Sequence, residues 1–244
     1  MQLIKANRDA LLKPLTTVAG IVERRHTLPI LANILLRKRG NQVSFIATDL
    51  EVQITATAMF GVGDEDVDLT VAARKLLDIL RALPDGEEIT LSQAPNKLTV
   101  QCGKSRFSLQ TMSAAEYPTL AEPEAVNVGI ALLQKTLKHL FAMTHYAMAQ
   151  QDIRYYLNGS LLVFEPQALH AVATDGHRLA HCCCAADGIE ATTEIILPRK
   201  TVLELQRLLE DSEETVKIDV GAGQVRYQFQ GVELISKLVE GKFP

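Results

Sequence analysis

The chain repeats itself at a nearly constant offset, and this repeat constrains the fold more than any other feature of the sequence. Thr48-Asp49 recurs as Thr174-Asp175, 126 residues later, and Ala73-Arg74-Lys75 recurs as Pro198-Arg199-Lys200, 125 residues later. Two further pairs keep this order and spacing: LLKPL from Leu11 with TLKHL from Thr136, and SAAEYP ending at Pro118 with VEGKFP ending at Pro244. Because the period is much longer than that of a solenoid, each copy is predicted to be a domain, over residues 1–123 and 124–244.

Within each copy, strand patterns outnumber helix patterns. QVSFIATD, VQITATAMF, KLTVQCG and RFSLQTM alternate apolar with polar or small residues, as half-buried antiparallel strands do. Apolar residues recur at helical spacing in four segments: 8–25, 72–83, 131–151 and 198–210. Pro14 is expected to bend or delay the first helix. The sequence therefore predicts an α+β fold in each copy, with two helices laid against antiparallel sheets.

The longest apolar stripe of the second copy follows the expected helix 131–151. Its members are Leu133, Leu137, Leu140, Met143 and Tyr146. This spacing predicts that all five side chains face the core.

The charges are divided unevenly between the expected helices and the rest of the chain. The net charge is −4. The four helical segments hold 12 Lys/Arg and 5 Asp/Glu, whereas the remainder holds 13 basic and 24 acidic residues. The helices therefore carry +7 and the remainder −11. One interpretation is a set of ordinary solvated faces, and the other is a basic surface that meets a polyanion.

Composition is that of an ordinary globular protein, with 47% hydrophobic and 22% charged residues. No apolar run approaches the roughly 18 residues that a membrane helix needs, and the N-terminus has no signal-peptide pattern. The chain has four cysteines, three of them adjacent, which argues against a disulfide framework. We expect a protein of a reducing cytoplasm with no membrane partner.

The stretch TDGHRLAHCCC, residues 174–184, has the composition of a metal site. Along a strand, however, Cys182 and Cys184 would face one way while His181 and Cys183 face the other. This alternation would scatter the ligands, and no CxxC or helical HxxxH spacing is present. The sequence therefore predicts no metal and no cofactor, and Asp175 is expected to accept hydrogen bonds from the backbone of a turn.

The same stretch does not favour a catalytic nucleophile. Asp175 and His177 could orient one another, but no Ser or Cys lies in a nucleophile-elbow context and no Gly-rich phosphate loop exists. The prediction is a recognition surface without enzyme activity. The alternative is a metal-dependent hydrolase centred on Asp175, His177, His181 and the cysteines, which stoichiometric zinc would favour.

Several motifs, in order along the whole chain, resemble those of the bacterial β sliding clamp family, the processivity subunit of the replicative DNA polymerase. They are HTLPILANILL, ATDLE, ARKLLDILRALPDG, SRFSLQTM, QDIRYYLNG, VATDGHRLA, PRK and SKLVEGKFP. The resemblance implies a tandem clamp fold, with sheets outside and helices lining a ring of two three-domain chains around duplex DNA. Because the sequence stops at Pro244, we expect that it lacks the third domain, which leaves ring closure and homodimer formation in doubt.

The resemblance also implies partners and the residues that bind them. Non-specific contacts to double-stranded DNA are implied for Arg25, Gln151, Arg154, Tyr155, Tyr156 and Lys200. Binding of linear peptides from the polymerase, the clamp loader and repair proteins is implied for Leu157, Thr174, Gly176, His177, Arg178, Leu179 and Pro244. The first-domain half of the subunit interface is implied for Lys75, Lys104, Arg106, Phe107 and Leu109.

Overall fold

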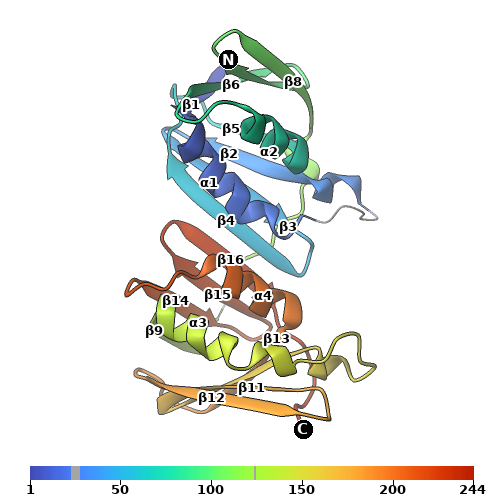
Figure 1. Ribbon diagram of the computed structural model, residues 1–244, viewed down its shortest axis with the longest axis vertical. Coiled ribbons are helices and arrows are strands. Elements are labelled where there is room, and N and C mark those ends of the chain that lie inside the picture. The colour runs from blue at the N-terminus through green and yellow to red at the C-terminus, as the bar shows by residue number, and fades with distance from the viewer. Residues whose placement is uncertain (23–27, 124) are drawn as a thin grey trace. The chain divides into compact units, whose positions relative to one another are not determined.

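The computed structural model describes residues 1–22, 28–123 and 125–244, which form two compact units, Met1–Leu120 and Ala121–Pro244 (Figure 1). The division falls three residues before the boundary predicted from the repeat. Each unit has eight strands and two α-helices among the described residues. The α+β prediction is therefore confirmed.

The elements of the two units follow one another in the same order. The first unit comprises β1 (Gln2–Asn7), α1 (Arg8–Ala19), β2 (Asn33–Arg39), β3 (Gln42–Thr48), β4 (Val52–Met59), β5 (Val67–Ala72), α2 (Ala73–Ala82), β6 (Glu88–Ala94), β7 (Lys97–Cys102) and β8 (Ser105–Met112). The second comprises β9 (Val128–Leu133), α3 (Gln134–Ala142), β10 (Gly159–Glu165), β11 (Gln167–Thr174), β12 (Leu179–Ala186), β13 (Thr193–Pro198), α4 (Arg199–Leu208), β14 (Thr215–Val220), β15 (Gln224–Phe229) and β16 (Val232–Lys237).

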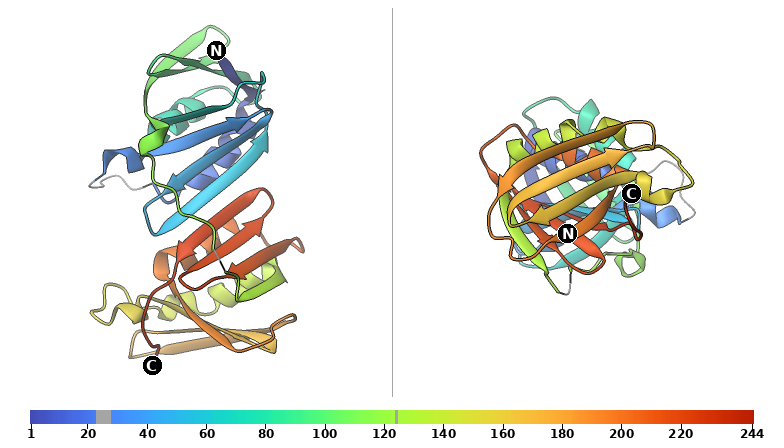
Figure 2. Two further views of the ribbon diagram at one scale, coloured as in Figure 1. Left: turned by 180° about the vertical axis from the view of Figure 1, so that it is seen from behind. Right: turned by 90° about the horizontal axis from the view of Figure 1, so that it is seen from below.

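Strand order is the same in the two units, and their registers correspond except for a shift between Gln2 and Ile4 of β1. The first unit has the antiparallel orders β1-β6-β7-β8 and β5-β2-β3-β4, and the second has β9-β14-β15-β16 and β13-β10-β11-β12. Within each unit the two helices pack side by side and contact both sets of strands. Figure 2 shows the strands of each unit from the side opposite the helices. The two halves of the chain therefore share one fold.

Two arginines at the helix starts show how closely the copies correspond. Arg74 donates a hydrogen bond to the carbonyl of Val22 at 3.5 Å, and Arg199 donates one to the carbonyl of Met148 at 3.4 Å. Val22 and Met148 are themselves 126 residues apart. Arg74 and Arg199 thus take matching positions, as the repeat predicts.

Both long helices are shorter than their apolar patterns predict. Helix α1 begins at Arg8, where the Asn7 side chain caps it by accepting from the amide of Asp9 at 2.9 Å. Pro14 is buried inside this helix. It does not delay the start of the helix, because the helix already begins at Arg8. The helix ends at Ala19 instead of residue 25.

Helix α3 covers only Gln134–Ala142, so the prediction of a helix over 131–151 is wrong at both ends. Leu137 and Leu140 are buried, whereas Met143 and Tyr146 are about half exposed. The buried hydroxyl of Thr144 donates to the carbonyl of Leu140 at 3.0 Å, an acceptor that a continuing helix would use itself. The chain then enters the short 3-10 helix η3 (His145–Ala147).

The core of each unit lies where the helices meet the strands. Leu11, Leu15 and Val18 of α1 are buried in the first unit, as are Val202 and Leu205 of α4 in the second. Burial of such a side chain stabilises a fold by about 1.5–3 kcal/mol. In the ranges 1–22, 28–123 and 125–244, no helix is long and apolar enough to cross a membrane.

Candidate functional site

The turn between β11 and β12 is built by two side chains that satisfy its backbone. The Asp175 carboxylate accepts hydrogen bonds from the amides of His177 (2.9 Å) and Arg178 (3.0 Å). The Thr174 hydroxyl donates to the carbonyl of Arg178 at 2.7 Å and accepts from the amide of Gly176 at 3.1 Å. The two amides, followed by the Arg178 guanidinium, stabilise the charged carboxylate and lower the pKa of Asp175 to about 2. The expectation that Asp175 organises a turn is confirmed.

The turn presents apolar and cationic groups to solvent. Leu179 is 65% exposed, and His177 and Arg178 are exposed beside it. The Arg178 guanidinium pairs with Asp175 at 2.9 Å and its Cζ lies 5.9 Å from the centroid of the Tyr146 ring. These contacts hold the arginine in place while its neighbour Leu179 stays open. An anchored cation beside an exposed leucine suits an apolar peptide segment that carries acceptors.

Arg154 joins this turn to the loop that precedes β10. Its guanidinium donates to the carbonyl of Asp175 at 3.4 Å and pairs with Asp152 at 2.8 Å. The hydrogen bonds from the Arg154 side chain and amide lower the pKa of Asp152 to about 2. A Cβ built on Gly176 would lie 3.1 Å from Arg154 Nη2. Arg154, for which the family resemblance implies DNA contact, therefore also lies against the predicted peptide site.

Leu157 and the C-terminal residues meet on the other side of the same loop. Leu157 belongs to the 3-10 helix η4 (Tyr155–Leu157), is only 1% exposed, and packs with Ala149, Ile196 and Phe243. Pro244 follows Phe243 and is exposed. Leu157 is thus a core residue beneath the predicted groove, whereas Leu179 and Pro244 are apolar groups at the surface.

A cavity of about 510 Å³ in the second unit lies on other residues. Its lining includes Leu161, Ile196, Val239 and Phe243, and it contains none of the seven predicted peptide-binding residues. Phe243 lines the cavity and also packs with Leu157 of the predicted site, but the two features have different lining residues.

Four of the residues assigned to DNA contact cluster around the loop between η3 and β10. Gln151, with a positive φ of 59°, is exposed with Arg154 and Tyr155, and the rings of Tyr155 and Tyr156 lie edge to face at 5.9 Å. Lys200 lies in the first turn of α4, whose first amide, that of Arg199, donates to the carbonyl of Asn158 at 2.9 Å. That hydrogen bond ties the helix start to the loop. Arg25 lies outside the described residues.

The four α-helices of the described ranges carry the excess of positive charge that the sequence assigns to them. Within their observed bounds they hold ten Lys/Arg and three Asp/Glu, so they still sum to +7. Some of this charge is paired locally, as in Lys135–Glu213 and Arg207–Glu204, both at 2.7 Å. Glu204 is already counted within α4, so of these two pairs only Glu213, outside the helices, offsets part of the +7.

The residues assigned to a subunit interface gather mainly on β8. Lys104, Arg106 and Phe107 are exposed and Leu109 is buried, while Lys75 is exposed on α2. Strand β8 pairs with β7 over residues 105–110 and with β5 at Thr111 and Met112. Residues 105–110 therefore form a strand edge outside the β5 ladder.

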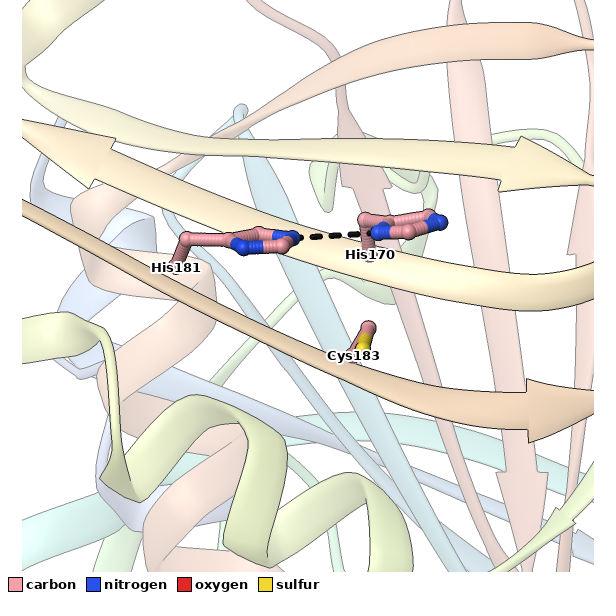
Figure 3. Close-up of side chains that lie close together, drawn as sticks. All are labelled: His170, His181 and Cys183. Carbon is pink, nitrogen blue, oxygen red and sulfur yellow. Dashed lines mark hydrogen bonds between the residues drawn. The ribbon is translucent and has the colours of Figure 1, made fainter.

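The predicted alternation along β12 is observed, but it does not scatter every candidate metal ligand, because His170 joins His181 and Cys183 from the neighbouring strand. His170, His181 and Cys183 come together on one face of the sheet, with their ligand atoms within 4.8 Å of one another (Figure 3). His181 and Cys183 do share one face and Cys182 and Cys184 the other, but His170 arrives from β11, the strand paired with β12. The antiparallel register of two strands, which one strand's pattern does not give, was the missing information.

The residues of the hydrolase alternative assemble only in part, because His181 and Cys183 lie together while Asp175 and His177 lie outside their cluster. The Asp175 carboxylate is engaged by the turn amides and by Arg178, and the His170–His181–Cys183 cluster includes neither Asp175 nor His177. Burial raises the pKa of the half-buried Cys184 thiol to about 11, which keeps it protonated and unreactive. Nothing in this geometry favours that alternative.

The fold is that of sliding clamps. The crystal structure of a DNA polymerase sliding clamp from Pseudomonas aeruginosa, solved with a ligand, matches all of this chain and 66% of its own, with a TM-score of 0.95 at 42% identity. A Caulobacter crescentus sliding clamp matches all of this chain and 67% of its own, with a TM-score of 0.92 at 39% identity.

Family models and curated relatives give the same result. Residues 1–121 match the DNA polymerase III beta subunit N-terminal domain, and residues 131–244 match its central domain. The beta sliding clamp of Pseudomonas putida is 46% identical over 97% of this chain, which spans about 65% of that relative's length. The chain belongs to the DNA polymerase III beta subunit family of bacterial sliding clamps.

Proposed function

We propose that this chain supplies two domains of a clamp that surrounds duplex DNA and keeps the replicative polymerase on its template in the bacterial cytoplasm. The observation that carries the proposal is the +7 on four α-helices of a chain whose net charge is −4, within a sliding-clamp fold. A clamp held by its closed shape needs only weak attraction to phosphates, because tight contacts would stop it sliding. This role requires no catalytic residue, and we infer that the chain is not an enzyme.

The test is binding of the 244-residue chain to unrelated duplexes over a range of salt concentrations. We expect weak binding that falls steeply with salt and is the same for each sequence. Lys138→Glu on α3 should reduce binding, whereas Lys217→Glu on β14, the same charge change on a strand, should have a smaller effect. Salt-independent binding, or an equal loss in both variants, would contradict the proposal.

The proposed protein partners are the polymerase, the clamp loader and repair proteins, which would dock short peptides on the turn Thr174–Leu179 and Pro244. Support comes from the exposed Leu179, the anchored Arg178 and the Arg154 side chain that lies against the turn. One solved relative from Pseudomonas aeruginosa is bound to griselimycin, which offers a second probe besides a labelled apolar peptide. Binding by either probe is expected.

A matched pair of variants tests this surface. Leu179 and Met59 are both 65% exposed apolar side chains on strands, but only Leu179 lies in the proposed site. Leu179→Glu should weaken peptide binding at least about tenfold, as loss of an interface anchor does, and Met59→Glu should leave it unchanged. Equal affinities for the two variants would show that the peptide binds elsewhere.

The strand edge of β8 is the proposed contact with another clamp chain. Phe107 and the unpaired edge of residues 105–110 are the groups that support it. Hydrogen exchange of the chain with and without the Pseudomonas aeruginosa clamp tests the proposal. Added clamp should slow exchange in residues 105–110 but not in β3. If residues 105–110 exchange at the same rate with and without the added clamp, the proposal is overturned.

A further inference from the structure

Three side chains with soft or imidazole donors converge on the solvent face of β11 and β12. His170 pairs with Cys183 across the two strands, and Val172 pairs with His181, so the two histidines lie diagonally. Their rings lie side by side, with centroids 5.3 Å apart and planes 9° apart, and His170 Nδ1 lies 3.0 Å from His181 Nε2 (Figure 3). His181 and Cys183 are exposed and His170 is half-buried. The donors are therefore accessible to an ion from solution.

The spacing of these donors fits a tetrahedral metal ion. Zinc bonds nitrogen at about 2.0–2.1 Å and sulfur at about 2.3 Å, so its ligands lie about 3.3–3.6 Å apart. The two ring nitrogens are already at 3.0 Å, and all three donor atoms lie within 4.8 Å of one another. Binding of one ion therefore requires the two ring nitrogens to move apart by a few tenths of an ångström, from 3.0 Å to about 3.3 Å. Imidazole and thiolate favour zinc, whereas magnesium and calcium require oxygen donors.

Glu165 prepares His170 for this role. Its carboxylate oxygen lies 3.6 Å from His170 Nε2, the ring nitrogen that faces away from the cluster. A carboxylate on that side favours the tautomer that carries its proton on Nε2, which leaves the Nδ1 lone pair directed at His181. A metal ion would take the place of the proton that the two rings share, and Cys183 would release its thiol proton on binding.

We propose that His170, His181 and Cys183 form a zinc site, with Glu165 as the positioning residue for His170 and the fourth position open to water or to a donor from a partner. The site staples β11 to β12 on the face opposite the helices. It is independent of the clamp function proposed above.

Cobalt(II) is the spectroscopic probe for the reduced, metal-free 244-residue chain under anaerobic conditions. About one equivalent should bind and produce a thiolate-to-cobalt charge-transfer band together with the ligand-field bands of a tetrahedral ion. Zinc should displace it. A wild-type chain that shows no charge-transfer band, or that binds cobalt only in octahedral geometry, would overturn the proposal.

Variants identify the ligands. His181→Ala and Cys183→Ser should each weaken zinc binding by more than about 100-fold, and Glu165→Ala by about 10- to 100-fold. Cys182→Ser is the matched control, because Cys182 lies on the opposite face of the same strand and should leave affinity unchanged. Circular dichroism in chelator confirms folding of each variant. Unchanged affinity in Cys183→Ser would overturn the assignment, while DNA and peptide binding would remain a separate question.

Discussion

The turns Thr48–Val52 and Thr174–Arg178 take equivalent places in the two copies and have the same hydrogen bonds. The Thr48 hydroxyl donates to the carbonyl of Val52 at 2.9 Å, and Asp49 accepts from the amides of Glu51 (3.0 Å) and Val52 (2.8 Å). Every one of these bonds has its counterpart in the second turn. The Thr-Asp pair therefore defines the turn, and the residues that follow it can differ between the two copies.

The difference lies at the position with positive φ. Leu50 has φ 79° and packs against a buried cluster that includes Ile30 and Tyr117, whereas Gly176 has φ 87° and leaves room for the Arg154 guanidinium. The Leu50 side chain fills the space beside the first turn, whereas the Arg154 side chain, from another loop, lies beside the second. One backbone scaffold thus yields a core element in one copy and a candidate binding surface in the other.

The largest expected effect comes from removing what the turns share. Thr48→Val and Thr174→Val each lose one hydrogen bond donated to a carbonyl and one accepted from an amide. Each should lower the free energy of unfolding by about 1–3 kcal/mol. Urea denaturation measures this, with Thr→Ser at both positions as the control that keeps the hydroxyl. A loss in only one copy would break the equivalence of the turns.

Exchanging the residues that differ should have a smaller effect on stability and a larger one on binding. Gly176→Leu places a side chain at φ 87° against Arg154, at a cost of about 1–2 kcal/mol. Peptide binding should be lost, whereas DNA binding should fall by no more than it does in Arg154→Ala, because the added side chain contacts that guanidinium. Titration of a labelled apolar peptide decides it, since equal binding by variant and wild type would remove Gly176 from the site.

Acid should loosen the second turn within a defined pH range. The pKa of Asp175 is lowered to about 2, below the ordinary value of about 3.9. The folded turn binds the charged carboxylate more strongly, so its contribution is complete above pH 4 and is lost as the pH falls through 2. The amide chemical shift of His177 should titrate near pH 2 and become flat in Asp175→Asn. A midpoint near 4 would contradict the hydrogen-bond cause.

The smallest effect on stability is expected at the last residue of each turn, which is Val52 in the first and Arg178 in the second. Val52 is fully buried, whereas its counterpart Arg178 is exposed and lies over Tyr146. Arg178→Ala should reduce stability by no more than about 1 kcal/mol, the value of an exposed cation–π contact. Thermal unfolding measures it. A larger loss would mean that the Asp175–Arg178 pair holds the turn together.

Local patterns in the sequence predicted the repeat, the strands and the Thr-Asp turn because these features depend on residues close together in the chain. The predicted end of the third helix was wrong because a side chain competes for a backbone acceptor there: the Thr144 hydroxyl donates to the carbonyl of Leu140. The burial of Leu157 depends on Phe243, which is 86 residues away in sequence. The His170–His181–Cys183 cluster depends on the register of two strands. Such contacts become visible only when the segments are placed in space.

The partly paired strand β8 also bears on whether identical copies of this chain can join edge to edge. An open strand edge can extend into fibres by adding identical edges, and cationic side chains on the edge oppose this. Lys104 and Arg106 lie at the start of this edge, just before the exposed Phe107, so a second copy paired there would set like charges close together. A strand with acidic side chains would meet no such repulsion. The repulsion between these cationic side chains therefore favours pairing of β8 with a different strand over pairing with an identical one. Salt weakens this preference because it screens the repulsion.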